Sequence, residues 1–570
     1  MAQIQREHHP VAGRGPDARG RTVDAGMSDL RRLLDRLGRR GQVRPMRVAT
    51  PAGVRPVSRR VLPSPNPPPA AVVALHRMAF GPRPGDVERF NALGGTDPER
   101  LEAYVEDQLH PESIDDSALE QRLAAAGFTT LGKSAAQLWA DHVAAKPDWK
   151  TRMQPLYETE RATFLRALFS ACQLREVLAD FWHNHFNVYA WDYYAGATWV
   201  AWDRDVIRGH IFGNFREMLH ATATSPAMLV YLDNHVNSNA GPNENYAREL
   251  LELHTLGAMN YLGVRLQSEV PTGADGIPVA YVDGDVYEAT RCLTGWTFDD
   301  DSGEFLYREE WHDRFQKHVL GLFLPADQPP LADGRALLDR VAVHPGTARH
   351  IGTKLCRRLI ADEPPREVVE AAARVFLDQA DAPDQLRRVV RTILLSEAFR
   401  TTWGAKVKRP FEIVVGAMRA ANVSPRFALD ESVTNRLLGY FDRTGQPLFS
   451  HRAPDGYPDL AEDWLSTGTL VSTWRTVNWV LATHDDDDVD LFDVAAETPE
   501  DRRSPELLAA HWIERVLGRP ATPALHQEIV DFLALGRDPE IPLDLGDEDV
   551  AERVRNAVAL IAMSPQFLER

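Results

Sequence analysis

The sequence is poor in cysteine and has no long apolar run. Its three cysteines, Cys172, Cys292 and Cys356, are far apart and odd in number, which predicts neither a disulfide framework nor a CxxC metal site. Isolated buried thiols are the expected state. No apolar stretch approaches the roughly 18 residues that a membrane-spanning helix needs. We therefore expect no transmembrane segment.

Common catalytic fingerprints are also missing. The chain has no GxGxxG after a strand, no Walker loop, no HExxH helix and no GxSxG elbow. Nucleotide-cofactor and serine-hydrolase functions therefore have no support. Basic residues are outnumbered, with 64 Lys and Arg against 82 Asp and Glu, and the net charge is −18. Such a chain repels polyanions, so we expect no nucleic-acid partner.

The first 68 residues differ in composition from the rest. Residues 1–70 hold 14 Arg against 5 Asp and Glu, a net charge of +9, which leaves −27 for the remainder. Abundant Arg, Gly and Pro predict a disordered basic tail over residues 1–68. Within it, residues 28–38 have the pattern of a short basic amphipathic helix that contacts a partner or a membrane surface. The alternative is a marginal helix on a flexible tail.

No apolar segment typical of an export signal follows the arginines of this tail, so the sequence predicts no signal peptide and, by default, a cytoplasmic protein. A second charged segment, the acidic run at residues 484–490, is expected to be a solvated loop. A calcium site is the alternative there, although the spacing is not that of an EF-hand loop.

Helical periodicity dominates from about residue 70 onward. We predict a mainly α fold, with an N-terminal helical lobe over residues 69–345 and a C-terminal helical lobe over 346–570. The Gly-, Asp- and Pro-rich part between 258 and 345 is expected to be an irregular insertion, with at most a small β-hairpin formed by 278–283 and 303–308. The periodic stretches are 70–80, 98–110, 115–126, 134–145, 158–190, 204–220, 243–257, 285–295, 335–361, 366–379, 383–396, 410–422, 463–482, 504–517, 522–535 and 548–562.

One predicted helix, residues 174–187, carries two histidines. At about 100° per residue, His185 falls within the apolar face and His183 falls on the opposite side, beside Glu176 and Asp180. The two histidines cannot bind one metal ion while the helix is regular. The non-functional alternatives are a boundary histidine paired with Asp180 for His183, and a core histidine bonded to a carbonyl for His185.

A second predicted helix, residues 243–257, is apolar over more than half its circumference. His254 lies within that buried arc, and Glu249 lies between two of its leucines. A buried carboxylate needs a cation, a proton or several hydrogen-bond donors. A metal ion and a buried arginine satisfy that need equally well, so the sequence leaves both open.

Arginines near Glu249 are the competitors of a metal ion. Arg248 and Glu252 have the spacing of an ion pair along one helix face. Arg291, in a predicted helix that opens with a capping box, is a candidate partner for Glu249. Further along the irregular insertion, His312 and Asp313 are adjacent and can supply metal ligands or acid–base groups from a loop.

These motifs resemble the bacterial domain-of-unknown-function 1800 (DUF1800) family, in order from about residue 70 to the C-terminus. The resemblance implies no established activity or substrate. Proteins of that family often look exported, and the missing signal is a departure from them. Glu244, Arg248, Glu249 and Glu252 match the family's longest motif, whereas position 254 accepts phenylalanine in similar sequences. The matching segments are 181–186, 231–234, 242–257, 285–296, 312–317, 354–357, 406–408 and 564–567.

The leading hypothesis is a metal-dependent enzyme. In it, His183, His185 and Glu249 bind a divalent metal, and His312 and Asp313 act with Glu249 in catalysis. Hydrolysis by metal-activated water is the most economical reaction, followed by oxidative chemistry at iron or copper. The alternative is a non-catalytic binding or envelope-assembly protein with a structural network of buried charges. The residues of that network are Arg248, Glu252, Arg291 and Glu244.

Overall fold

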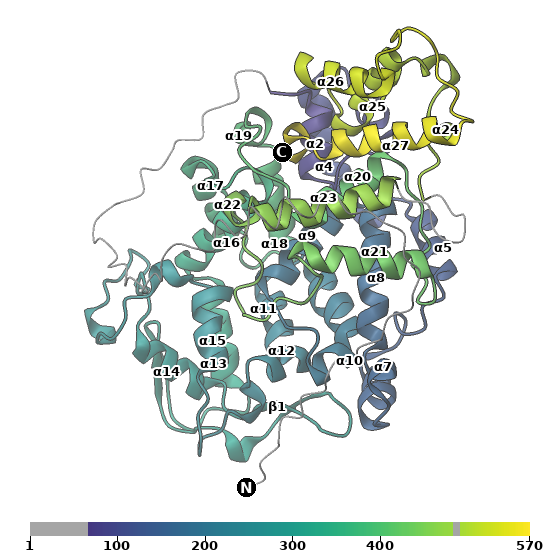
Figure 1. Cartoon of the computed structure of the whole chain (residues 1–570). Coiled ribbons are helices and arrows are strands. Elements are labelled where there is room, and N and C mark those ends of the chain that lie inside the picture. Colours follow the sequence, from purple (N-terminus) through teal and green to yellow (C-terminus); the bar gives the residue numbers. More distant parts are fainter. Residues whose placement is uncertain (1–66, 483–490) are drawn as a thin grey trace, which may run out of the picture. The chain divides into compact units, whose positions relative to one another are not determined.

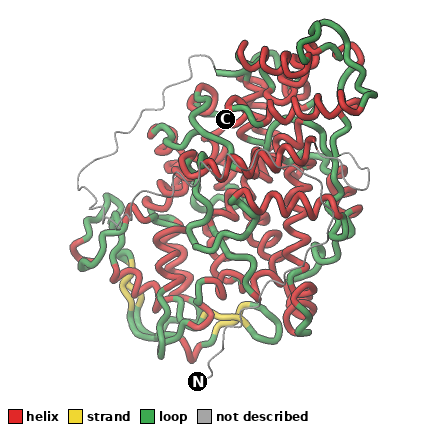
Figure 2. Tube along the Cα trace, in the orientation of Figure 1, coloured by secondary structure: helices red, strands yellow, loops and turns green. Residues whose placement is uncertain are grey.

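The computed structural model describes residues 67–482 and 491–570. The predictions for the tail before residue 67, for residues 28–38 and for the acidic run at 484–490 lie outside the described residues. The described residues belong to one compact unit, and the prediction of two lobes within it stays a prediction. Figures 1 and 2 show that its described part consists mainly of helices joined by loops, with little strand, which confirms the mainly α fold class. None of the described helices is both long and apolar enough to cross a bilayer.

The helices up to residue 292 fall partly on the predicted periodic stretches. The stretch 158–190 holds two helices with a break at 170–172, and the helices at 86–91, 149–152, 193–201 and 226–231 lie outside the predicted stretches. The predicted helices form where apolar positions recur at helical spacing, and caps fix their starts: the Glu99 carboxylate of α4, for example, accepts the Thr96 backbone N–H at 2.9 Å. The elements are α2 (Ala70–Arg77), α3 (Asp86–Asn91), α4 (Asp97–Leu109), η1 (Pro111–Ser113), α5 (Ser117–Ala125), α6 (Ala135–Trp139), η2 (Ala140–Ala144), α7 (Trp149–Arg152), α8 (Gln154–Phe169), α9 (Gln173–His185), α10 (Tyr193–Ala201), η3 (Trp202–Ile207), η4 (Arg208–His210), α11 (Phe215–Thr224), α12 (Pro226–Tyr231), η5 (Asn234–Val236), α13 (Asn245–Glu249), η6 (Leu250–His254), η7 (Ala258–Asn260), η8 (Gln267–Glu269) and α14 (Asp283–Cys292).

The irregular insertion contains two small antiparallel hairpins. In the first, β1 (Trp296–Phe298) pairs with β2 (Phe305–Tyr307), and in the second β3 (Lys317–Val319) pairs with β4 (Leu322–Leu324); η9 (Glu309–Trp311) lies between them. The predicted segment 303–308 is thus a strand, but its partner is β1. Segment 278–283 instead leads into α14, and its Tyr281 makes only an isolated bridge with Tyr261.

Helices return after the insertion, and several lie against the N-terminal ones. Helix α20 packs against α8, and α18 packs against α4, so segments more than 200 residues apart share one core. All three cysteines are buried free thiols. These later elements are α15 (Ala332–Ala342), α16 (Pro345–Leu359), α17 (Arg366–Asp378), α18 (Gln385–Leu394), α19 (Glu397–Thr401), α20 (Pro410–Ala420), α21 (Ser432–Phe441), η10 (Asp442–Thr444), α22 (Ala461–Trp464), α23 (Thr467–Ala482), α24 (Val494–Glu497), η11 (Glu500–Arg502), α25 (Pro505–Leu517), α26 (Pro523–Ala534), α27 (Glu548–Ala562) and α28 (Pro565–Leu568).

Candidate functional site

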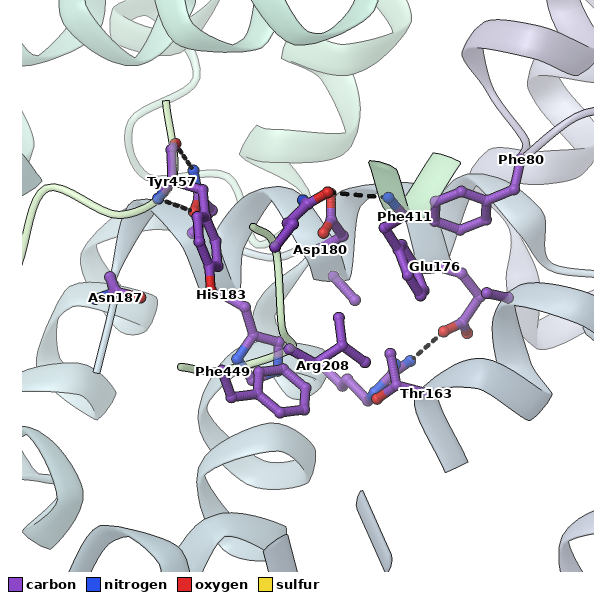
Figure 3. Close-up of a pocket in the computed structure, with 15 residues that line it drawn as sticks. Phe80, Thr163, Glu176, Asp180, His183, Asn187, Arg208, Phe411, Phe449 and Tyr457 are labelled. Carbon is purple, nitrogen blue, oxygen red and sulfur yellow. Dashed lines mark hydrogen bonds and ion pairs between the residues drawn. The ribbon is translucent and has the colours of Figure 1, made fainter. Parts of the chain in front are cut away.

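A cavity lies beside α9, with α8, α20, η4 and the loop 446–457 as its other walls (Figure 3). The space open to the centre of a water molecule is about 40 Å³, and one water needs roughly 10–15 Å³ of such space. The cavity therefore holds a few waters or a small polar group. Its lining residues are Phe80, Thr163, Ala167, Glu176, Ala179, Asp180, His183, Asn184, Asn187, Arg208, Phe411, Gln446, Leu448, Phe449 and Tyr457.

The polar face of α9 points into this cavity rather than into solvent. Glu176, Asp180 and His183, spaced by four and then three residues, all line it. The side chain of His183 is only 9 % exposed. His183 is only partly buried, as its helical angle predicts, but residues far along the chain cover this face with charged partners. Both faces of α9 are buried, one by apolar and one by polar groups.

His183 is paired with Asp203 of η3, not with Asp180. The two side chains meet at 2.8 Å between Nε2 and a carboxylate oxygen, while Nδ1 of His183 is buried and has no hydrogen-bond partner. Arg208 donates to both oxygens of Asp203, at 2.9 and 3.0 Å, and Arg166 approaches it at 3.2 Å. Burial alone would raise the pKa of Asp203, but these cations and the hydrogen bond from His183 outweigh it and hold the pKa well below its usual range.

A second ion network lies behind Asp180. One oxygen of Asp180 accepts from Arg409 and, at 3.2 Å, from Arg358. Glu412 of α20 accepts from Arg358 at 2.7 Å and from Arg570. Burial opposes ionisation of Glu412, yet the surrounding guanidinium groups hold its pKa well below the usual value. The two networks hold Asp203 and Glu412, which lie behind the cavity wall, in their ionised state.

The asparagines of the α9 motif attach the loop 446–459 to the helix. Asn184 accepts from the Tyr457 N–H at 2.6 Å and donates to the Tyr457 carbonyl at 2.7 Å. Asn187 donates to the carbonyls of His451 and Ala453 at 3.1 and 2.7 Å. A side chain at Gly456 would place its Cβ 2.2 Å from the Asn184 carbonyl oxygen, so only glycine fits there.

Phe449 in the same loop has a φ of 56°, a strained value for a bulky residue, and its ring lies 4.8 Å from that of His183. Strained backbone persists only where the surroundings hold it, and it is often found at functional sites. The loop, which the sequence analysis did not single out, therefore belongs to the cavity. Its signals in the sequence were the Gly and Pro residues around 453–458.

His185 lies on the other face of α9, in the apolar core. Its Nε2 is 3.1 Å from the His254 carbonyl, and its ring centroid is 6.2 Å from those of both His254 and His350. Burial, reinforced by the nearby charge of Lys354, lowers the pKa of His254 to about 3 and that of His350 to about 4. His185 therefore has the geometry of the non-functional alternative, a core histidine bonded to a backbone carbonyl.

Glu249 is half-buried rather than buried, and neither Arg248 nor Arg291 pairs with it. Burial raises its pKa, with Glu252 adding to the effect and Arg248 opposing it. The predicted helix over 243–257 is α-helical only to Glu249 and then widens into the π-helical turn η6. Because a π turn holds more residues than an α turn, angles drawn at 100° per residue misplace the side chains beyond it.

The arginine network forms, but with other partners. Arg248 binds Glu244 at 3.2 Å and lies 3.7 Å from Asp283, so the expected pair with Glu252 is absent from the described contacts. Arg291 donates from Nη1 to both oxygens of Glu288, at 2.8 and 2.9 Å, and makes a bidentate pair through Nε and Nη2 with Asp313, at 2.9 and 3.0 Å. Glu288, one turn earlier in α14, and Asp313, on the loop after the first hairpin, occupy the guanidinium group of Arg291 in place of Glu249.

His312 and Asp313 hold the insertion together. His312 uses Nδ1 toward Thr294, 2.9 Å from its carbonyl, and Nε2 toward Asp333 at 3.0 Å. Lys317, fully buried, donates to Asp333 and to the Asp313 carbonyl at 2.6 Å each. Because both nitrogens of His312 have protein partners, it has no nitrogen left for a substrate.

The structure thus brings His183 to a cavity but does not join it to His185, Glu249, His312 or Asp313. Within residues 67–482 and 491–570, no group of three or more His, Cys, Asp or Glu side chains is arranged to hold a metal ion. The partners that complete the cavity, Asp203, Arg166, Arg208, Arg358 and Arg409, escaped the sequence analysis. Asp203 in η3 and Arg208 in η4 are five residues apart, but no sequence pattern near them indicates that they contact α9.

Comparison with known proteins gives one result. A family model described as "Protein of unknown function (DUF1800)" matches residues 73–569. No curated protein and no solved structure matches the chain. The chain belongs to the DUF1800 family.

Proposed function

We propose that this DUF1800 protein is an enzyme that carries out acid–base chemistry on a small polar ligand in the cavity beside α9, with His183 as the general base. One observation carries the proposal. His183 lines the cavity and is oriented by Asp203 through Nε2, while its Nδ1 is buried without a hydrogen-bond partner. Most buried polar atoms are paired, so an unpaired one on a side chain that lines a cavity is a candidate contact for a small ligand.

The charge state of Asp203 sets the tautomer of His183. An ionised carboxylate only accepts hydrogen bonds. Nε2 of His183 therefore carries the hydrogen atom and is the donor of the hydrogen bond to Asp203. In a neutral imidazole this leaves the lone pair on Nδ1. A base oriented through its other nitrogen is the arrangement that general-base catalysis requires.

The hydroxyl groups of the cavity are occupied, which narrows the reaction class. The Thr163 hydroxyl donates to the Thr159 carbonyl at 2.8 Å, and the Tyr457 hydroxyl donates to the Pro447 carbonyl at 2.6 Å. Neither is bonded to His183 as an activated nucleophile would be. The proton that His183 takes therefore comes from water or from the ligand itself, and hydrolysis by activated water is the simplest such reaction.

A thermal-shift screen of a library of small polar metabolites tests the proposal. Wild-type protein is compared with His183→Asn and with the control His220→Asn, which removes another Asp-paired histidine at the surface. A ligand at 100 times its Kd adds about 2.7 kcal/mol to stability. We expect compounds that raise the Tm of the wild type and of the control but not of His183→Asn. A library without such compounds contradicts the proposal.

The non-catalytic alternative rests on the ion pairs away from the cavity. Arg291 with Asp313, and Arg248 with Glu244, are structural contacts whose residues do not line the cavity. If no compound distinguishes His183→Asn from the control, a binding or assembly protein with structural charges is the better account.

A further inference from the structure

The most exposed apolar side chains of the described residues gather in one segment. Met259, Val264, Phe315 and Leu266 are 94, 89, 75 and 66 % exposed, and no other large apolar side chain among the described residues exceeds them. Soluble proteins rarely keep such side chains together in water unless a partner covers them. All four lie between residues 258 and 324, in the insertion that carries η7, η8, α14 and the two hairpins.

Contacts around His318 draw together the segments that carry Leu266 and further exposed apolar side chains. Across the second hairpin, the His318 ring lies 4.8 Å from that of Phe323, which is also exposed. The carbonyl of His318 accepts from Gln267, next to Leu266, at 2.7 Å. The N–H of His318 donates to Glu288, next to the exposed Tyr287, at 3.0 Å.

Two more side chains extend this group. Pro278, next to the exposed Val279, lies against Gly321 at the hairpin turn. The N–H of Phe315 donates to Asp313 at 2.9 Å, and Arg291 ties Asp313 to the face of α14 that carries Tyr287. We name this group the His318 surface; it consists of Leu266, Val279, Tyr287, Phe315 and Phe323.

The exposed charges of the segment that carries the His318 surface are mostly acidic. The exposed basic residues between 258 and 330 are Arg265 and Arg314, and Arg314 is paired with Glu309 at 2.8 Å. The exposed acidic residues of the same stretch, apart from those in the turn of the first hairpin, which lies against Trp139, are Glu269, Asp275, Glu309, Glu310 and Asp327. An apolar surface on an acidic segment favours a partner of opposite charge.

We propose that the His318 surface binds a protein segment that presents apolar side chains flanked by Lys or Arg. The charge argument decides against two other occupants. An anionic lipid surface attracts basic, not acidic, protein surfaces. A second copy of this chain, joined through a twofold axis, would place two acidic segments against each other.

Peptide binding measured by fluorescence anisotropy tests the inference on the full chain. The probe is an 18-residue amphipathic Leu/Lys peptide, and a Leu/Glu peptide of the same pattern is its control. The test variant is Leu266→Ser with Phe323→Ser. The matched variant is Leu535→Ser with Ile541→Ser, which removes two similarly exposed side chains elsewhere. We expect the test variant alone to weaken Leu/Lys binding by roughly tenfold or more.

Equal binding by both variants, or stronger binding of the Leu/Glu peptide, would overturn the inference. So would binding of the wild type to phosphatidylcholine/phosphatidylserine vesicles, or a dimer in sedimentation that the test variant abolishes. If the test variant does not fold, hydrogen exchange of the wild type is the deciding measurement. We expect the Leu/Lys peptide to protect residues 258–324 from exchange. Protection that is confined to other residues contradicts the proposal.

Discussion

Asn184 and Tyr457 exchange two hydrogen bonds, of 2.6 and 2.7 Å, across 273 residues of sequence. The side-chain amide of Asn184 pairs with the backbone of Tyr457 as a strand neighbour would. One residue before it in α9, His183 faces the cavity that the Tyr457 loop covers. Helix α9 thus both supplies the proposed base and anchors the loop that encloses it.

Asn184→Ala is expected to loosen this loop. Two partly buried backbone groups of Tyr457 lose their partner, and each unsatisfied group costs about 1–3 kcal/mol. Urea unfolding should show a loss of roughly 2 kcal/mol or more, and hydrogen exchange should rise within residues 446–459. Asn91→Ala, at an exposed position, is the control. Unchanged exchange in the loop would show that other contacts hold it.

Asp203→Asn is expected to destabilise the fold by about 3–5 kcal/mol, because Arg166 loses its carboxylate and Arg208 keeps only Glu176. The depressed pKa of Asp203 contributes stability above its unfolded pKa of about 3.9, and that stability is lost as pH falls further. The difference between wild type and variant in urea unfolding should therefore persist at pH 5 and shrink only below about pH 4. Asp339→Asn at the surface is the control, and an equal effect there would refute the account.

His254→Phe is expected to stabilise the protein at neutral pH by about 1 kcal/mol, since both nitrogens of this fully buried histidine lack partners. The unfolded chain takes up a proton near pH 6.5 that folded His254 refuses until about pH 3. Wild-type stability is thus lost as pH falls below 6.5, at about 1.4 kcal/mol per pH unit for this histidine. The variant should show a shallower slope by that amount between pH 6.5 and 4. His220→Phe is the control. If His254→Phe and His220→Phe show the same change of unfolding free energy with pH between 6.5 and 4, the prediction is contradicted.

Lys317→Met is expected to cost about 3–5 kcal/mol, because the buried carboxylate of Asp333 keeps only His312 as a partner. Hydrogen exchange should rise in residues 309–324, and the ligand response of the cavity should stay as in the wild type. Lys150→Met, on the surface, provides the comparison. A lost ligand response with intact folding would instead place the His312 cluster in the functional site.

Helix positions were predictable because their signals are local. The periodic stretches 366–379 and 548–562 correspond to α17 and α27 almost residue for residue. Each has an apolar stripe whose spacing does not depend on its neighbours. The opposite placement of His183 and His185 follows from the same regularity, since α9 is a straight α-helix to His185.

The cavity was not predictable, because its contacts join distant residues. Nothing near Asp180 in the sequence points to Arg358 or Arg409, and the loop at Tyr457 has no periodic pattern. The error at Glu249 has a different cause: it was placed relative to Leu253 and Leu256, which lie within and beyond the π turn η6, where the number of residues per turn changes. Side chains beyond such a turn cannot be placed by angle alone.

The central claim is that His183 offers an unprotonated Nδ1 to the cavity, and nitrogen NMR of protein labelled with ¹⁵N-histidine tests it most directly. Resonances are assigned by their loss in His183→Asn. The account predicts a proton on Nε2 and none on Nδ1 at pH 7.5, with this preference reduced in Asp203→Asn. A proton on Nδ1, or a tautomer mixture that Asp203→Asn leaves unchanged, would contradict it.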